Sequence, residues 1–164
     1  MAAVRKERLL FGVFLLILIV AIELVLHRFH LPTWPAFMIM IFYFETHMDK
    51  SRAPHLILGG AVGIVCYMLT AQFVEAWGLA MGTATARLVC ICLVVYAIVA
   101  FGEVLPMVFN NYAFMLFLVS GLAAKLEGMT PEPWLWLGIQ SIGGTIVILA
   151  IIGIGKLMSA ITDA

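Results

Sequence analysis

Residues 34–42, WPAFMIMIF, and residues 111–118, NYAFMLFL, are two short copies of one pattern, and they decide how the chain is divided. Each copy carries Ala-Phe-Met followed by an apolar run, and each is entered through residues typical of a helix start. Each also lies in the middle of three successive apolar segments, so the chain divides into two halves of three segments. A repeat with an odd number of membrane spans must be inverted. We therefore expect an inverted repeat, with a passage or site between its halves.

The composition predicts an integral membrane protein. The chain has 164 residues, of which 65% are hydrophobic and only 11% are charged, and its mean hydropathy is +1.15. A soluble domain has about 45–50% apolar and about 25% charged residues. The net charge is zero, which argues against a nucleic-acid partner. We expect the lipid bilayer to be the main surrounding of this chain.

Six apolar segments predict an all-α fold with six transmembrane helices. They cover residues 9–26, 35–46, 54–73, 83–101, 112–124 and 134–157, and residues 75–82 are expected to form a turn. The second and fifth segments, with about 12–14 apolar residues, are shorter than a comfortable crossing of about 20 residues. We expect one transmembrane domain, with residues 1–78 as the first three-helix repeat and residues 79–164 as the second. The first segment is interpreted as a retained span, because no small-residue cleavage site follows it.

The distribution of Lys and Arg predicts that both termini are cytoplasmic. With the amino terminus inside, the inner side carries Arg5, Lys6, Arg8, Lys50, Arg52 and Lys156, and the outer side carries Arg28, Arg87 and Lys125. This asymmetry follows the positive-inside bias. Trp34, Trp77, Trp134 and Trp136 fall at outer ends of predicted spans, as an aromatic belt would.

The two short segments are the predicted solute site. A short helix can begin inside the membrane if the preceding backbone lines a cavity, and its amino end then offers free N–H groups. We expect two such ends to meet near the midplane, where they would favour an anion or a polar neutral solute. Ordinary tilted helices and a chance match remain the alternative. The predicted solute pathway comprises Trp34, Pro35, Phe37, Asn110, Asn111, Phe114, Glu23, His27 and Gln140.

Glu23 is the only acidic residue well inside a predicted span. An ionisable residue in a membrane suggests function by default, and Glu23 and His27 share a helix face at i, i+4. They could form a proton-responsive pair, because histidine titrates near neutral pH. Alternatively, Glu23 lies one turn from the outer interface and simply pairs with His27 or Arg28.

The other polar residues have structural alternatives. Asn110 and Asn111 could cap the fifth helix or contact solute, and Gln140 could bond across helices or contact solute. Arg87 could pair with Glu75 or Glu103, or extend to the interface. The pattern Gly59-x-x-x-Gly63 favours close helix packing, and the pair Gly143-Gly144 is expected to do the same.

The joint at residues 45–55 could be a cytoplasmic gate or a solvated loop that supplies positive charge. Glu45, His47, Asp49 and His55 occur there, but spacing alone does not make a metal centre of three or four convergent ligands. The three cysteines, Cys66, Cys90 and Cys92, are expected to be small buried hydrophobic residues. We expect no cofactor, haem included, and no metal site.

The chain resembles the YcdZ-type family of small bacterial inner-membrane proteins, whose function is unknown. The resemblance rests on residues 31–37, LPTWPAF, on Tyr43-Phe44, on residues 60–65 and 112–114, and on the glycine-bearing last segment. It extends across residues 31–69 and 105–157, whereas residues 47–52 are more charged and the loop at 125–133 is longer than in the pattern. The resemblance implies the fold and a multi-pass location in the bacterial inner (plasma) membrane, and it carries over no functional residue.

These observations predict a membrane channel or facilitator for a small polar or anionic solute, with pH sensitivity as a further expectation. The alternative is a non-catalytic membrane scaffold or a subunit of a larger membrane complex. An enzyme is not expected, because no nucleophile–base set is present. We expect a homo-oligomer that acts on a small-molecule solute.

Overall fold

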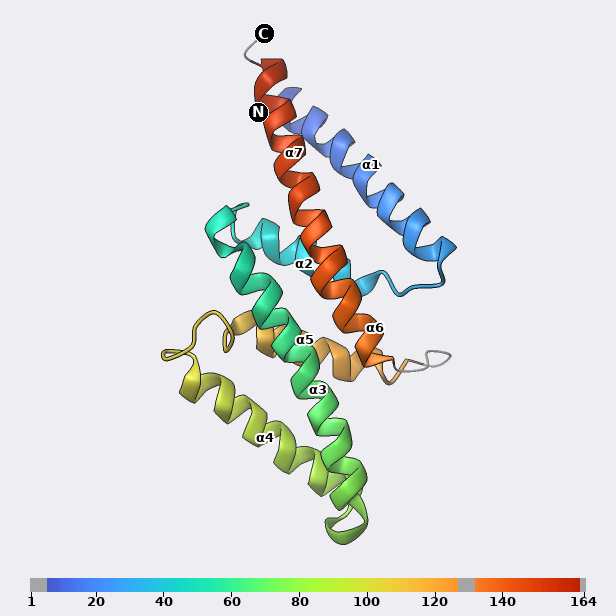
Figure 1. The fold of residues 1–164 in the computed structure, drawn as a ribbon, viewed down its shortest axis with the longest axis vertical. Coiled ribbons are helices and arrows are strands. Elements are labelled where there is room, and N and C mark those ends of the chain that lie inside the picture. The colour runs from blue at the N-terminus through green and yellow to red at the C-terminus, as the bar shows by residue number, and fades with distance from the viewer. Residues whose placement is uncertain (1–5, 127–131, 163–164) are drawn as a thin grey trace, which may run out of the picture.

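The computed structural model describes residues 6–126 and 132–162, whose regular secondary structure is entirely helical, with no strand. The first five helices are α1 (Lys6–Arg28), α2 (Trp34–Glu45), α3 (Ala53–Met81), α4 (Thr83–Phe101) and α5 (Asn111–Ala123). A short 3-10 turn, η1 (Lys50–Arg52), precedes α3. The sixth helix comprises α6 (Pro133–Gly138), a π-helical turn η2 (Ile139–Gly143) and α7 (Gly144–Thr162). The predicted all-α fold is confirmed over these ranges (Figure 1).

Four helices in the described ranges are long and apolar enough to cross a membrane. They cover Arg8–Arg28, Lys50–Met81, Thr83–Phe101 and Pro133–Ile161. The helices α2 and α5 have 12 and 13 residues. At a rise of 1.5 Å per residue, each is about 18–20 Å long, less than the ~30 Å of a bilayer core. The prediction that the second and fifth helices are short is confirmed, and neither of them has the length of a full span.

The predicted turn at residues 75–82 is wrong. The helix α3 continues to Met81, and the chain breaks only at Gly82, whose φ of +86° favours glycine. No proline interrupts this stretch, so a polar residue such as Glu75 remains on the helix. The predicted loop at residues 125–133 lies partly, and Arg5 wholly, outside the described residues.

The long helices α3 and α7 each pack against helices of the other half. In Figure 1, α3 is crossed by α5 and meets α4 at one end, whereas α7 is crossed by α2 and meets α1 at one end. The starts of the two short helices also correspond, because Trp34 and Asn111 are separated by 77 residues. This is the offset between Ala36 and Ala113 in the two Ala-Phe-Met copies.

Glycines of the long helices allow these close contacts. A Cβ atom on Gly63 of α3 would meet the backbone carbonyl of Ala113 in α5. On the other side, a Cβ on Gly144 would lie 2.8 Å from the Ile39 side chain in α2. The alanines of both Ala-Phe-Met copies, Ala36 and Ala113, are fully buried. The predicted packing role of these glycines is confirmed.

Candidate functional site at the helix joints

The short helices α2 and α5 lie antiparallel. The Tyr112 ring, in the first turn of α5, contacts the Phe42 ring near the end of α2 at a centroid distance of 5.1 Å. At the other end, Trp34 shares a pocket with Leu122 near the end of α5. The predicted meeting of the two amino ends is therefore wrong. The physical reason is that each amino-terminal turn packs against a different long helix, α2 against the glycines of the sixth helix and α5 against Gly63.

The first joint pocket, of about 440 Å³, lies where α1 turns into α2. Its polar lining is Glu23, His27, Thr33 and Trp34. Its apolar wall includes Val119, Leu122 and Ala123 of α5, which the sequence did not assign to the site. Three residues of the predicted pathway are thus brought together. Among the described residues, Glu23 forms no hydrogen bond or ion pair with His27 or Arg28. Its side chain lines the pocket without such a partner.

Trp34 offers an unused donor beside this pocket. Its indole ring packs edge-on against Trp136, with ring centroids 5.3 Å apart. The Nε1 atom is buried and has no hydrogen-bond partner among the described residues. A buried unpaired donor costs about 1–3 kcal/mol. A water molecule or a polar solute that accepts this hydrogen bond would therefore be favoured.

The second joint pocket, of about 360 Å³, lies where α4 leads into α5. Glu103, Asn110, Asn111 and Phe114 line it, together with apolar residues of α4. Asn111 occupies the place of Trp34 at the 77-residue offset, since both are the first residue of the short helix. Among the residues that the structure describes, each joint pocket is lined by one glutamate and by no Lys or Arg.

Asn110 holds the second joint together. Its Oδ1 accepts hydrogen bonds from the backbone N–H groups of Tyr112 and Ala113 at 3.0 and 3.1 Å. Its Nδ2 donates to the carbonyl of His55 at 3.2 Å and to those of Pro106 and Met107. The capping alternative for Asn110 is confirmed. The cap occupies backbone N–H groups at the start of α5, where the sequence predicts N–H groups free for a solute.

Gln140 is a structural amide. It is fully buried, and its Nε2 donates to the carbonyl of Ile57 in α3 at 3.0 Å, while its Oε1 accepts from Ser141. It lies in the π-helical turn η2, which interrupts the regular register of the sixth helix. The predicted alternative of a bond across helices is confirmed. Gln140 lines neither joint pocket, and the same holds for Pro35 and Phe37.

The joint at residues 45–55 has the geometry of a capped loop. Asp49 caps η1 by accepting hydrogen bonds from the backbone and hydroxyl of Ser51, and these bonds lower the pKa of its carboxyl from the ordinary value. The Tyr43 hydroxyl donates to the carbonyl of Met48 at 2.9 Å. In the part of the chain that the structure describes, no group of three or more His, Cys, Asp or Glu residues could hold a metal ion.

The space between the joint pockets is filled by packed side chains. Ile39 of α2, Leu116 of α5 and Ile64 of α3 are all fully buried. The two pockets are therefore separate in this conformation. They share no lining residue and lie at opposite ends of the α2–α5 pair.

Comparison with known proteins gave no relative. The chain matches no model of a known protein family, and no match was found among curated proteins or solved structures. The resemblance to the YcdZ-type family stays a prediction.

Proposed function

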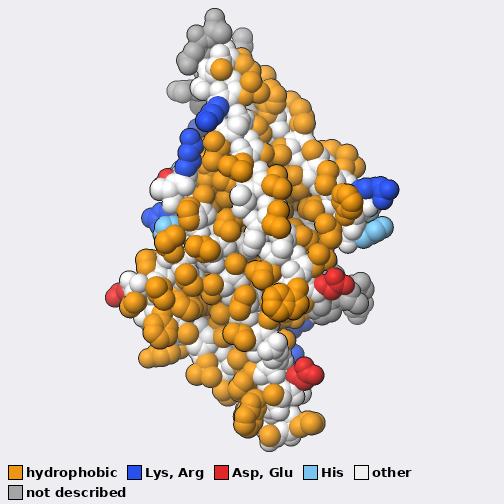
Figure 2. All heavy atoms as spheres, viewed as in Figure 1, with side chains coloured by type: hydrophobic (Ala, Val, Ile, Leu, Met, Phe, Trp, Pro, Cys, Tyr) orange, Lys and Arg blue, Asp and Glu red, His pale blue; other side chains and the backbone are white. Residues whose placement is uncertain are grey.

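We propose that the chain is a multi-span membrane protein built as two inverted repeats. The two Ala-Phe-Met copies and the starts of the short helices, both 77 residues apart, support this, as does the packing of each long helix against helices of the other half. Hydrophobic side chains cover most of the face in Figure 2, and charged side chains gather toward two opposite margins. A surface of this kind is costly in water and natural in lipid.

In the proposed orientation both termini are cytoplasmic in a bacterial inner membrane. The start of α1 and the end of α7 lie at the same end of the molecule (Figure 1), as an even number of crossings requires. The first joint then faces the outside together with Arg28 and Lys125, and the second joint faces the cytoplasm. The assignment to the bacterial inner membrane rests on the resemblance to the YcdZ-type family. The placement of both termini on the cytoplasmic side rests on the positive-inside bias.

We infer that the protein is a facilitator for a small polar, uncharged or weakly basic solute. The observation that carries this inference is the pair of joint pockets, which combine a carboxylate, hydrogen-bonding groups and apolar walls at corresponding places. A glutamate carboxylate in a pocket that no Lys or Arg lines disfavours the binding of an anionic solute. Because packed side chains separate the pockets, the solute would pass by alternating exposure rather than through an open pore. Glu23 and His27 give the first pocket a titratable lining and hence a source of pH sensitivity.

The test is solute-driven swelling of proteoliposomes, measured by stopped-flow light scattering. Glycerol, urea and formamide are compared with acetate and nitrate, with protein-free liposomes as the baseline. We expect entry of at least one uncharged solute to exceed the baseline, and Trp34→Ala to change its rate. If no solute in the panel enters above the baseline over a range of pH, the facilitator is contradicted.

A second candidate is a membrane scaffold or a subunit of a larger assembly. One observation favours it: the spanning window of α1 contains no buried residue, so that most of the α1 surface is available to lipid or to another chain. Leu9, Leu16 and Leu24 are each about 60% exposed. A homo-oligomer would cover part of this face, and the mass of the purified protein in detergent, by light scattering, tests for it.

A further inference from the structure

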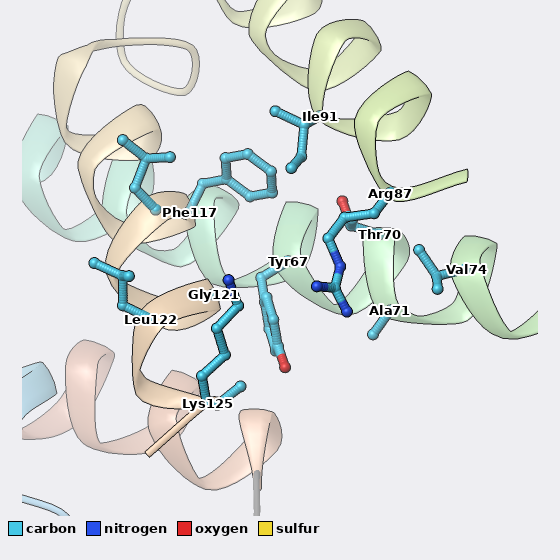
Figure 3. Close-up of a pocket in the computed structure, with 12 residues that line it drawn as sticks. Tyr67, Thr70, Ala71, Val74, Arg87, Ile91, Phe117, Gly121, Leu122 and Lys125 are labelled. Carbon is cyan, nitrogen blue, oxygen red and sulfur yellow. The ribbon is translucent and has the colours of Figure 1, made fainter. Parts of the chain in front are cut away.

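A third cavity, of about 480 Å³, lies between α3, α4 and α5 and shares Leu122 with the first joint pocket (Figure 3). Twelve residues line it, among them Tyr67, Arg87, Ile91, Phe117, Gly121 and Lys125. Two of these side chains are cationic and eight are apolar or glycine. This composition differs from that of the joint pockets, each of which carries a glutamate and no cation.

The two cations that line the cavity are Arg87 and Lys125. Arg87 reaches the cavity from the beginning of α4, and Lys125 reaches it from just beyond the end of α5, so that the two side chains flank Tyr67 in Figure 3. Among the described residues, neither forms an ion pair. Of the two alternatives for Arg87, the ion pair with Glu75 or Glu103 is not observed among the described residues. Two unpaired cations beside a low-dielectric wall attract an anion more strongly than they would in water.

The polarity of the cavity changes along its length. Arg87 and Lys125 lie close to the ends of their helices, where a membrane helix meets the interface. Ile91 lies one turn further into α4, and Phe117 lies two turns further into α5. An occupant with a charged head and an apolar tail matches this gradient.

The corresponding place in the other half of the chain is filled. At the 77-residue offset Gly121 corresponds to Phe44, which packs against the core and contacts the Phe11 ring at a centroid distance of 6.4 Å. Lys125, just beyond the end of α5, corresponds to Met48, just beyond the end of α2. At these two positions the second half therefore has a glycine and a cation where the first half has an aromatic ring and an apolar side chain.

We propose that this cavity binds a single-chain anionic amphiphile, with its carboxylate or phosphate head between Arg87 and Lys125 and its acyl chain along Ile91, Phe117 and Gly121. A water-sized group takes up roughly 30 Å³, so the cavity holds on the order of 16 non-hydrogen atoms. This is the size of a fatty acid with one medium-length chain, and it is far smaller than a two-chain phospholipid. The site is distinct from the joint pockets and does not require solute to pass through them.

Gly121 provides a clean test. A Cβ atom on Gly121 meets no atom within 4 Å, so a larger side chain can enter the cavity without displacing backbone. Gly121→Phe supplies the ring that Phe44 supplies in the other half, and Gly121→Ala is the matched control. Both changes also replace a glycine inside a helix, which favours folding.

Binding is measured on the delipidated full-length protein in detergent, by native mass spectrometry and by displacement of a fluorescent fatty acid. The probes are myristate, tetradecyl phosphate, tetradecanol, tetradecyltrimethylammonium and phosphatidylglycerol. We expect myristate or tetradecyl phosphate to bind, tetradecanol to bind at least tenfold more weakly, and the cationic amphiphile not to compete. Comparison of the first two probes distinguishes a carboxylate head from a phosphate head.

Gly121→Phe should abolish this binding and Gly121→Ala should retain it, while Arg87→Gln/Lys125→Gln should weaken it at least tenfold. Equal binding of tetradecanol, full binding to Gly121→Phe, or a preference for phosphatidylglycerol over both single-chain anions would overturn the proposal. The solute entry assay on Arg87→Gln/Lys125→Gln keeps the two proposals apart, because neither Arg87 nor Lys125 lines a joint pocket.

Discussion

The Tyr112 hydroxyl donates a hydrogen bond to the Glu45 carboxylate at 3.1 Å, which ties the first turn of α5 to the last turn of α2. The two residues are 67 positions apart, and each belongs to the short helix of its half. This contact joins the start of α5 to the end of α2, as the antiparallel arrangement of the two helices requires.

The tie between Tyr112 and Glu45 should be measurable as a coupling. We expect Tyr112→Phe and Glu45→Ala each to lower the unfolding free energy in detergent, with a coupling energy on the order of 0.5–1 kcal/mol in the double-mutant cycle. Chemical unfolding of the four proteins, followed by tryptophan fluorescence, gives this value. Strictly additive effects would show that the hydrogen bond does not connect the two helices.

Gly63→Ala should destabilise the protein by about 1–3 kcal/mol, because its methyl group would collide with the Ala113 carbonyl and force α3 away from α5. The matched control is Gly153→Ala on α7, where an added Cβ meets no atom within 4 Å. The control should be neutral or stabilising by up to about 1 kcal/mol. Thermal unfolding in detergent compares the two, and equal melting temperatures would contradict the close packing of α3 on α5.

Asn110→Ala should cost about 0.5–2 kcal/mol from the lost cap alone, and more once the bond to the His55 carbonyl is gone. Asn110→Asp keeps the acceptor and loses the donors, and it should therefore fall between Asn110→Ala and the parent. The neighbouring change Asn111→Ala, at an exposed position, serves as the control. If Asn111→Ala proved the more destabilising variant, the capping role of Asn110 would be refuted.

Glu23→Gln should alter the pH dependence of solute entry, because it removes the only carboxylate that lines the first joint pocket. The matched control is Glu75→Gln on α3, an exposed acidic residue that lines neither joint pocket. Entry rates in proteoliposomes between about pH 5 and pH 8 cover the range in which histidine titrates. A profile for Glu23→Gln that matches both the parent and the control would assign Glu23 a structural role.

The sequence predicted the helices well, because helix bounds depend on local features of the chain. These features are the length of an apolar segment and a proline or asparagine at its start. The start of α2 was expected at Pro35 and is observed at Trp34, and α5 was expected to begin at Tyr112 and begins at Asn111. The end of α3 was missed, because the polar residue Glu75 resembles a loop signal yet leaves helix geometry intact.

The site was predicted only in part. Glu23 and His27 were grouped because their spacing places them on one helix face, whereas the α5 residues opposite them depend on tertiary packing that spacing does not encode. The sequence predicts that the amino ends of α2 and α5 meet. In the structure each end packs against glycines of a different long helix, and the sequence does not show which helix these glycines contact. The cavity at Arg87 attracts an anion because Arg87 has no acidic partner among the described residues. The sequence shows which residues are charged but not which of them lie close together, so this property was not predicted.

The central claim, that the two joint pockets open toward opposite faces of the membrane, is tested most directly by cysteine accessibility. Cys66, Cys90 and Cys92 are replaced by serine, and a single cysteine is introduced at Thr33 in the first pocket or at Asn111 in the second. A membrane-impermeant maleimide is then applied to sealed vesicles of known orientation. We predict that the cysteine at position 33 is labelled from the outside and the cysteine at position 111 only from the cytoplasmic side. Labelling of both cysteines from the same face would contradict the inverted repeat.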